Sequence, residues 1–307
     1  MNTTAPLQDQ LANISPVWVV VTVMVFTLIR LALAKNRDGW ARTVSETCDT
    51  INFVLVLAFL LIRPFVAQAF YIPSESMEST LLVGDRLIVN KFVYRFQEPQ
   101  RGDVIVFEAP PNAPGYRSDA NVDYIKRLIA LPGDTLQITR PRILIDGRPV
   151  DYAPEADNLH DFLRRRLGLT DEIGPDGDPR QDAIKIQENS LLIRPATGAE
   201  PYEMSKERVA ELLGQPGAKI TMVPGQVVLN GKPTTEAYIR EDPDYPQYQY
   251  PPDAETTITV EPGKVFVMGD NRNRSADSHA WGQLDKNRIV GKAVFVFWPP
   301  NRIGAIK

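Results

Sequence analysis

The sequence of 307 residues has very few of the side chains that build disulfides and metal sites. Cys48 is its single cysteine, so a disulfide within the chain is excluded and the redox surroundings stay open. The histidines number only two, His160 and His279, which excludes a histidine-rich metal centre, and no cysteine pair exists for zinc. We therefore expect no metal and no other cofactor.

A strong net charge is missing as well. The formal net charge is -4, from 34 basic and 38 acidic residues, which argues against a general nucleic-acid binder. Apolar residues make up 43% of the chain, enough for a packed protein. The 26 prolines favour turns and edge strands over a helical bundle.

Apolar runs near the N-terminus predict membrane-spanning helices. Residues 17–34 contain one charge, Arg30, and would form about 27 Å of helix, close to the hydrocarbon thickness. In residues 51–70, only Asn52 is polar before Arg63 and Pro64, which we expect near an interface. The alternative is a pair of buried core helices, which fits two such runs in succession less well.

The charges around these runs predict an orientation. The intervening loop carries Lys35, Arg37 and Arg42, whereas residues 1–16 contain no lysine or arginine, which also argues against a cleaved signal peptide. By the positive-inside rule the loop stays in the cytoplasm, with the N-terminus and everything after residue 70 outside. We therefore expect a multi-pass protein of the cell (cytoplasmic or inner) membrane whose C-terminal part is extracytoplasmic.

After residue 80 the sequence is typical of β structure. Its apolar runs are short and rich in β-branched residues, and Gly, Pro, Asp and Asn separate them. Residues 136–150 resemble residues 220–234, and each segment contains a hairpin dipeptide, Asp146-Gly147 or Asn230-Gly231. Internal duplication and convergent hairpin chemistry explain this similarity equally well.

The predicted fold is mainly β: an antiparallel β-sheet catalytic core with a β-rich, partly helical insertion subdomain, preceded by the two transmembrane helices. Residues 1–70 would form the membrane anchor, residues 71–136 and 263–307 the core, and residues 137–262 the insertion. Inside the insertion, helical patterning occurs at about residues 158–167 and 205–213, and a polar loop at residues 172–182.

The stretch YIPSESMESTL, residues 71–81, places several hydroxyl side chains directly after the membrane-like region. A solvated exit loop is the ordinary interpretation, because serine and glutamate are common in loops. A catalytic serine would need a base to take its proton. His160 is expected on a helix surface, and His279 lies in an ordinary turn beside Asp277, so neither histidine is a strong candidate.

Lysine is the other available base. Its ordinary pKa of about 10.4 must be lowered by desolvation before it can act near neutral pH. Lys126 lies inside the apolar stretch DYIKRLIALPGD and would share its strand face with Tyr124 and Leu128. Arg127 points the other way and does not deprotonate in proteins. Strand lysines are usually edge residues, so this pattern alone indicates a base only weakly.

At these residues the sequence resembles bacterial type I signal peptidases, which are serine–lysine proteases of the membrane. PSESMESTL (73–81) is similar to their nucleophile box. The resemblance continues in order through GDRLIVNKF (84–92), RGDVIVF (101–107), DYIKRLIALPGD (123–134) and MGDNRNRSADSHAWG (268–282). Residues 137–262 match only loosely. Five boxes in order count strongly against a plain solvated loop.

The resemblance implies a role for each matching residue. Ser76 would be the nucleophile and Lys126 the general base. Ser74 would donate its hydroxyl to the oxyanion, together with the backbone N–H of Ser76. Ser275 would hydrogen-bond the lysine amine, and Asp277 would support that box. The substrate cleft would include Ile72, Pro73, Tyr124 and Ile125, with Met77 packed beneath the serine turn.

This sequence departs from the family pattern at three positions. Glu75 stands where glycine is common, and Ser79 stands where proline is usual. His279 replaces an arginine that, in relatives, pairs with the aspartate matching Asp277. Because a neutral histidine pairs more weakly than arginine, this support is expected to depend on pH.

The resemblance implies cleavage of secretory signal peptides after small residues, in an Ala-x-Ala-like pattern. Expected partners are the signal peptides of these precursors, membrane lipid and the translocation machinery. FVYRF (92–96) and VFVFWPP (294–300) could dock on lipid, although ordinary strand packing is favoured for the second. Other classes stay open: a specialised paralogue with few substrates, a catalytically silent membrane-anchored binding protein, and a histidine-dependent serine protease.

Overall fold

The structure is a computed structural model, and it describes residues 16–33, 38–57, 67–116, 122–169, 172–173, 179–180, 182–196, 199–244 and 256–307. The chain divides into two compact units. The first contains residues 1–71, 86–98 and 291–304, and the second contains residues 72–85, 99–290 and 305–307. The described strand pairs are antiparallel, which confirms the predicted mainly β class.

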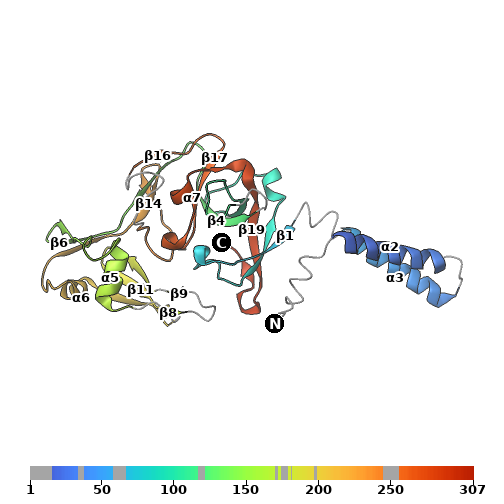
Figure 1. Ribbon diagram of the computed structural model, residues 1–307, viewed down its shortest axis with the longest axis horizontal. Coiled ribbons are helices and arrows are strands. Elements are labelled where there is room, and N and C mark those ends of the chain that lie inside the picture. Colours follow the sequence, from blue (N-terminus) through green and yellow to red (C-terminus); the bar gives the residue numbers. More distant parts are fainter. Residues whose placement is uncertain are drawn as a thin grey trace. The chain divides into compact units, whose positions relative to one another are not determined.

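Helices α2 (Pro16–Leu33) and α3 (Gly39–Val56) begin the first unit and lie side by side (Figure 1). Asn52 Nδ2 donates to Thr27 Oγ1 at 3.2 Å, and Arg30 Nε lies 3.0 Å from Asp49 Oδ1. Within the described ranges, we find no helix whose length and apolar character together would let it cross a membrane.

The helix expected over residues 51–70 has the wrong bounds. Helix α3 already begins at Gly39, and residues 67–71 form strand β1 instead (Ala67–Tyr71). The strand is favoured there because its backbone pairs with a neighbouring strand, with Phe70 opposite Leu87. Some parts of the predicted anchor lie outside the described residues: Lys35, Arg37, Arg63 and Pro64.

The sheet of the first unit runs in the order β1, β2, β19, where β2 spans Arg86–Asn90 and β19 spans Ile289–Trp298. Strand β20 (Gly304–Ala305) pairs with β19. Gly291 is required by this close pairing, since a Cβ there would lie 2.5 Å from Asn90 O. Short 3-10 turns, η3 (Val93–Arg95) and η6 (Pro300–Arg302), also belong to this unit.

The core sheet of the second unit runs in the order β3, β4, β17, β18. Its register places Ile105 opposite Lys126 and Val267 opposite Leu128. Most apolar residues of these strands are buried, namely residues 104–107, 128–130 and 265–268, so the strands predicted in this part of the sequence are confirmed. The bounds are β3 Val104–Glu108, β4 Asp123–Ala130, β17 Lys264–Met268 and β18 Leu284–Asp285.

The two similar segments, residues 136–150 and 220–234, pair with each other. Strand β5 pairs with β14, and β6 pairs with β13, while each segment also closes its own hairpin, β6 with β7 and β14 with β15. Asp146 has φ 48° and Asn230 has φ 51°, so both predicted hairpin turns are confirmed. The bounds are β5 Thr135–Thr139, β6 Arg142–Ile145, β7 Arg148–Pro149, β13 Ile220–Val223, β14 Gln226–Leu229, β15 Lys232–Pro233 and β16 Ile258–Thr259.

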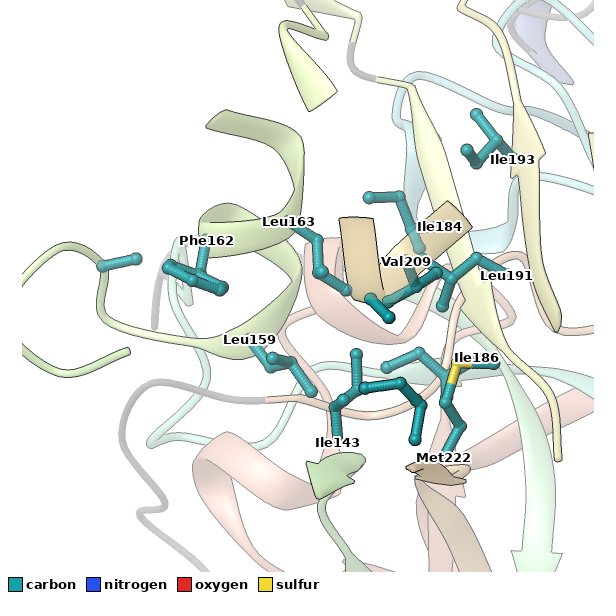
Figure 2. Packing of buried hydrophobic residues seen from close by; sticks show 13 residues of the cluster. Ile143, Leu159, Phe162, Leu163, Ile184, Ile186, Leu191, Ile193, Val209 and Met222 are labelled. Carbon is teal, nitrogen blue, oxygen red and sulfur yellow. The ribbon is translucent and has the colours of Figure 1, made fainter. Parts of the chain in front are cut away.

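Residues 137–262, still called the insertion here for brevity, contain a hydrophobic cluster of their own (Figure 2). Helices α5 (Leu159–Leu167) and α6 (Lys206–Leu212) confirm the predicted helical patterning, and Asn158 caps α5 by accepting from Asp161 N at 2.8 Å. The helices pack with Ile143 and Met222 against a small sheet. That sheet consists of β10 (Ala183–Ile186), β11 (Ser190–Arg194) and β12 (Tyr202–Ser205); β8 (Glu172–Ile173) pairs with β9 (Pro179–Arg180).

The prediction that His160 lies on a helix surface is wrong. Its side chain is only 1% exposed, and its Nδ1 lies 2.9 Å from Asp244 Oδ2. Asp244 follows 84 residues later in the chain, so the local pattern of α5 could not reveal this partner.

Candidate active site

The expected nucleophile lies in a short, well-fixed turn. Strand-like residues up to Ser74 lead into the 3-10 turn η2 (Glu75–Met77), which Glu78 N closes by donating to Glu75 O at 2.8 Å. Met77, expected beneath the serine turn, is fully buried. Ile72 anchors the approach, because its N–H donates to Asp85 O and its carbonyl accepts from Gly84 N, both at 2.9 Å.

The structure brings Ser76 and Lys126 together. Lys126 Nζ lies 2.6 Å from Ser76 Oγ, and the two side chains come from η2 and β4, 50 residues apart in the chain. Their residues are 7% and 5% exposed. This is hydrogen-bond distance between a hydroxyl and a possible proton acceptor, inside a site shielded from water.

The surroundings of Lys126 favour its neutral form. Burial lowers the pKa of Lys126 to about 8, and the carboxylates of Asp277 and Asp270 oppose this shift through space. Across the described residues, no carboxylate lies within ion-pair distance of the amine. Tyr124 lies on the same face of β4, with its ring centroid 5.6 Å from Nζ.

Ser74 lies next to this pair. Its Oγ is 3.4 Å from Ser76 Oγ, and the residue is exposed, so a bound carbonyl could reach it. The residues expected to line the substrate cleft differ in their exposure and in the direction of their side chains. Ile72 is buried, Pro73 is exposed, and Ile125 projects to the opposite face of β4 from Lys126 by strand alternation.

Ser275 is buried in the same region, but its expected bond to Lys126 is not formed. Among the described residues its Oγ has no hydrogen-bond partner. It approaches η2 across Gly269, where a Cβ would lie 2.3 Å from both Ser275 Oγ and Ser76 O. Only glycine permits this close approach, and the sequence alone did not indicate Gly269 as part of the site.

Asp277 organises the segment that carries Ser275. It caps helix α7 (Ser278–Trp281), its Oδ1 lies 2.8 Å from His279 Nδ1, and its Oδ2 accepts from Gly269 N at 2.8 Å. Burial opposes ionisation, yet the contacts with His279 and Gly269 lower the pKa of Asp277 below its ordinary value. The structure thus places His279 on Asp277, whereas the basic group in contact with Ser76 is Lys126.

A buried ion pair supports the site from the other face of β4. Arg127 donates from Nε to Asp270 Oδ1 at 2.8 Å and from Nη2 to Asp270 Oδ2 at 2.7 Å. Arg127 Nη2 also donates to Thr80 Oγ1 at 3.0 Å, which links this pair to residues 75–80, called here the nucleophile turn. Sequence reasoning missed this function of Arg127; its place inside an apolar strand was the available signal.

Known proteins similar to this chain agree on its family. The family described as "Signal peptidase, peptidase S26" matches residues 44–193 and 198–298. Signal peptidase I of Leptolyngbya laminosa is 33% identical over 261 residues, covering 85% of this chain and 83% of that protein. Signal peptidase I of Aquifex aeolicus is 33% identical over 250 residues, covering 80% of this chain and 81% of that protein.

Two further proteins are similar to this chain at lower sequence identity. Thylakoidal processing peptidase 1 of Arabidopsis thaliana is 25% identical over 272 residues, covering 87% of this chain and 53% of that protein. The crystal structure of a signal peptidase I from Enterococcus faecalis is 19% identical, with a TM-score of 0.23, and covers 64% of this chain and 97% of that one. The family match and the identities of about one third show that the chain belongs to the signal peptidase family, peptidase S26, and is a serine endopeptidase.

Proposed function

We propose that the chain cleaves N-terminal signal peptides from secretory precursor proteins, with Ser76 as nucleophile and Lys126 as general base. The observation that carries this proposal is the distance of 2.6 Å between Lys126 Nζ and Ser76 Oγ. The pKa of Lys126, lowered by burial to about 8, supports it further, because a neutral amine can accept the hydroxyl proton.

The reaction follows the usual course of acyl transfer to a serine. The Ser76 oxygen attacks the carbonyl carbon of the scissile peptide bond while its proton passes to the Lys126 amine. The resulting ammonium returns that proton to the leaving amine as the peptide bond breaks. Water, activated in turn by the neutral lysine, then hydrolyses the ester and frees Ser76.

Ser74 and the backbone N–H of Ser76 are proposed to stabilise the oxyanion. The Ser74 hydroxyl lies 3.4 Å from Ser76 Oγ and is exposed to an incoming substrate. Removing one such donor typically costs about 100-fold or more in turnover. Cleavage after small residues, in an Ala-x-Ala-like pattern, is the proposed specificity, and an extended peptide would pair along a strand beside Ile72, Pro73, Tyr124 and Ile125.

The membrane is the proposed location. Support comes from the apolar run of residues 17–34 and from exposed apolar side chains of the first unit. Phe96 is 73% exposed and Trp298 is 40% exposed, as membrane-interface aromatics would be. The N-terminus and the residues after 70 are proposed to lie on the extracytoplasmic side. Protease digestion of intact spheroplasts tests this, and full protection of the residues after 70 would contradict it.

The decisive experiment compares purified wild type with Ser76→Ala, Lys126→Ala and His279→Ala on a panel of secretory precursors. We expect the first two variants to lose cleavage and His279→Ala to retain a measurable part. Loss in His279→Ala with activity in Lys126→Ala would favour the histidine-dependent alternative. Cleavage of very few precursors by the wild type would favour the specialised paralogue, and cleavage of none would favour a silent binding protein.

A further inference from the structure

Residues 236–244 of the insertion, called here the bridging segment, lie against the nucleophile turn. Ser79 Oγ donates to the backbone carbonyl of Tyr238, and Arg240 forms an ion pair with Glu78. The Tyr238 ring also covers the Arg127 guanidinium, whose Cζ atom lies 4.0 Å from the ring centroid. The insertion therefore contacts the residues that directly follow Ser76.

The bridging segment is also fixed to the core segment behind Ser76. Arg272 donates to Glu236 at 2.8 and 2.6 Å, and both side chains are almost completely buried. Arg272 Nε donates to Gly269 O at 3.0 Å, next to the close contact of Gly269 with Ser76. Arg240 N donates to Asp270 O at 3.1 Å. These bonds hold one side of the bridging segment.

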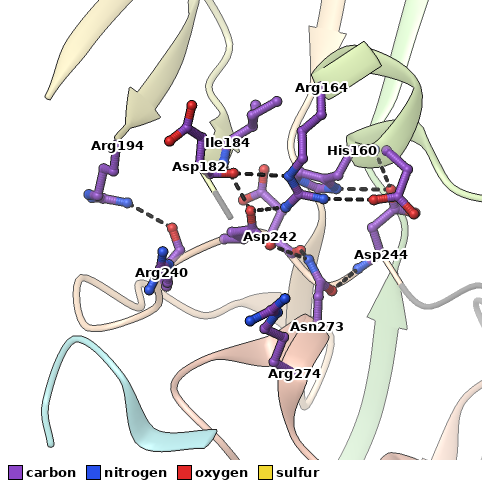
Figure 3. Close-up of polar contacts among 12 residues, drawn as sticks. His160, Arg164, Asp182, Ile184, Arg194, Arg240, Asp242, Asp244, Asn273 and Arg274 are labelled. Carbon is purple, nitrogen blue, oxygen red and sulfur yellow. Dashed lines mark hydrogen bonds and ion pairs between the residues drawn. The ribbon is translucent and has the colours of Figure 1, made fainter. Parts of the chain in front are cut away.

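Carboxylates of the bridging segment hold its other side to the insertion (Figure 3). Glu241 accepts from Ile184 N at 3.0 Å and pairs with Arg164. Asp242 accepts from Ile186 N at 2.6 Å. The Asp244 carboxylate pairs with His160, whose Nδ1 lies 2.9 Å from Asp244 Oδ2. The backbone of Asp244 faces the core instead, because Asp244 N donates to Asn273 Oδ1 at 2.8 Å. Since the insertion has its own packed core (Figure 2), it gives the bridging segment a rigid support.

The nucleophile turn contains a backbone strain that needs such support. Ser79 has φ +91°, in the left-handed region that favours glycine, and Thr80 N closes this turn on Met77 O at 3.1 Å. A strained conformation persists only where the surroundings over-determine it. The bridging segment stabilises this conformation through the bond of Ser79 to Tyr238 and the ion pair of Glu78 with Arg240.

We propose that the bridging segment positions the nucleophile turn, and that Arg240 is a positioning residue for Ser76, acting through Glu78. The inference rests on the proposed function, in which Ser76 is the nucleophile. Met77, the only residue between Ser76 and Glu78, is fully buried, so a shift of Glu78 passes directly into η2. The insertion thereby contributes to turnover without touching the reacting atoms.

The test is a charge-reversal cycle with Arg240→Glu, Glu78→Arg and the double variant. We expect each single variant to lower kcat about tenfold with a smaller change in KM, because a misplaced nucleophile affects chemistry more than binding. The double variant restores the ion pair with opposite polarity and should return kcat to within about threefold of wild type. Thermal unfolding of all variants reports whether the fold is kept.

The controls separate this inference from the proposed function. Arg208→Glu, at an exposed ion pair with Glu211 on the insertion, should leave kcat unchanged. If Ser76→Ala still cleaves, the proposed function fails. If Ser76→Ala is inactive while the folded single variants turn over like wild type, the positioning inference is overturned. It is also overturned if the double variant is no better than the singles, because the contact would then be only structural.

Discussion

Lys126 and His160 are both buried nitrogen bases, yet the structure treats them in opposite ways. Lys126 contacts a hydroxyl, that of Ser76, and burial lowers the pKa of Lys126 to about 8. His160 contacts a carboxylate, that of Asp244. Burial acts against its charge as well, but Asp244 and its acidic neighbours raise the pKa of His160 above the ordinary value.

The difference shows that the partner in contact decides what burial does to a base. Asp277 and Asp270 act on Lys126 only through space, and their effect is smaller than that of desolvation. A carboxylate at hydrogen-bond distance, as at His160, raises the pKa of the base and favours its charged form. The lysine is thus suited to accepting a proton, and the histidine to holding the bridging segment.

Giving Lys126 a carboxylate partner would break this comparison with the largest effect. In Ser76→Asp, the new carboxylate would lie beside the amine, so the pKa of Lys126 should rise above its ordinary value and cleavage should be lost. In Ser76→Ala cleavage is also lost, but the pKa should stay near 8 because no charge is added. NMR titration of labelled lysine separates the variants; equal pKa values in both would contradict the argument.

Crowding the lysine site should have the next largest effect. In Gly269→Ala, the new Cβ would overlap Ser275 Oγ and Ser76 O, each 2.3 Å away. A displacement of about 1 Å in the nucleophile is expected to lower kcat about 100-fold. Gly39→Ala is the control, since its Cβ would enter open space. Full turnover by a folded Gly269→Ala protein would refute the required close approach.

The pH dependence of cleavage sharpens the comparison further. Below a pH of about 8 the rate should rise up to tenfold per pH unit, as Lys126 loses its proton, and then level off. Asp277 raises the pKa of Lys126, so in Asp277→Asn this rise should move to lower pH. Its plateau should fall about tenfold, because the bond to Gly269 N is weakened. An unshifted pH profile in Asp277→Asn would exclude an electrostatic effect of Asp277 on Lys126. A plateau rate equal to that of wild type in Asp277→Ala would exclude a supporting role of Asp277.

What the sequence predicts well is local, and what it misses is long-range. The hairpins at Asp146 and Asn230 follow from turn chemistry between neighbouring residues, and the structure confirms both. The surface position predicted for His160 is wrong because its partner is 84 residues away. Gly269 was missed because its requirement arises from its contacts with Ser76, which is distant in the chain, and with Ser275.

The candidate site lies between these cases. Strand alternation placed Lys126 and Tyr124 on one face, and the structure agrees. The partnership of Lys126 with Ser76, 50 residues apart, needed the family resemblance, because no local pattern links them. The roles of Ser74, Ser275 and Asp277 stay predictions, and Ser275 does not make its expected bond.

The smallest effect on turnover, and a clear one on stability, is expected at His160. His160→Leu leaves the buried Asp244 carboxylate without its ring partner, which should lower the free energy of unfolding by about 3 kcal/mol. His160→Gln keeps a side-chain donor and should lose less. Because the folded pKa of His160 is raised, its contribution is complete below the unfolded pKa of about 6.5 and is lost as the pH rises through the folded value. Denaturant unfolding at several pH values measures this contribution. If the difference in the free energy of unfolding between wild type and His160→Leu grows with pH, the histidine is buried in its neutral form. The contrast with Lys126 would then disappear.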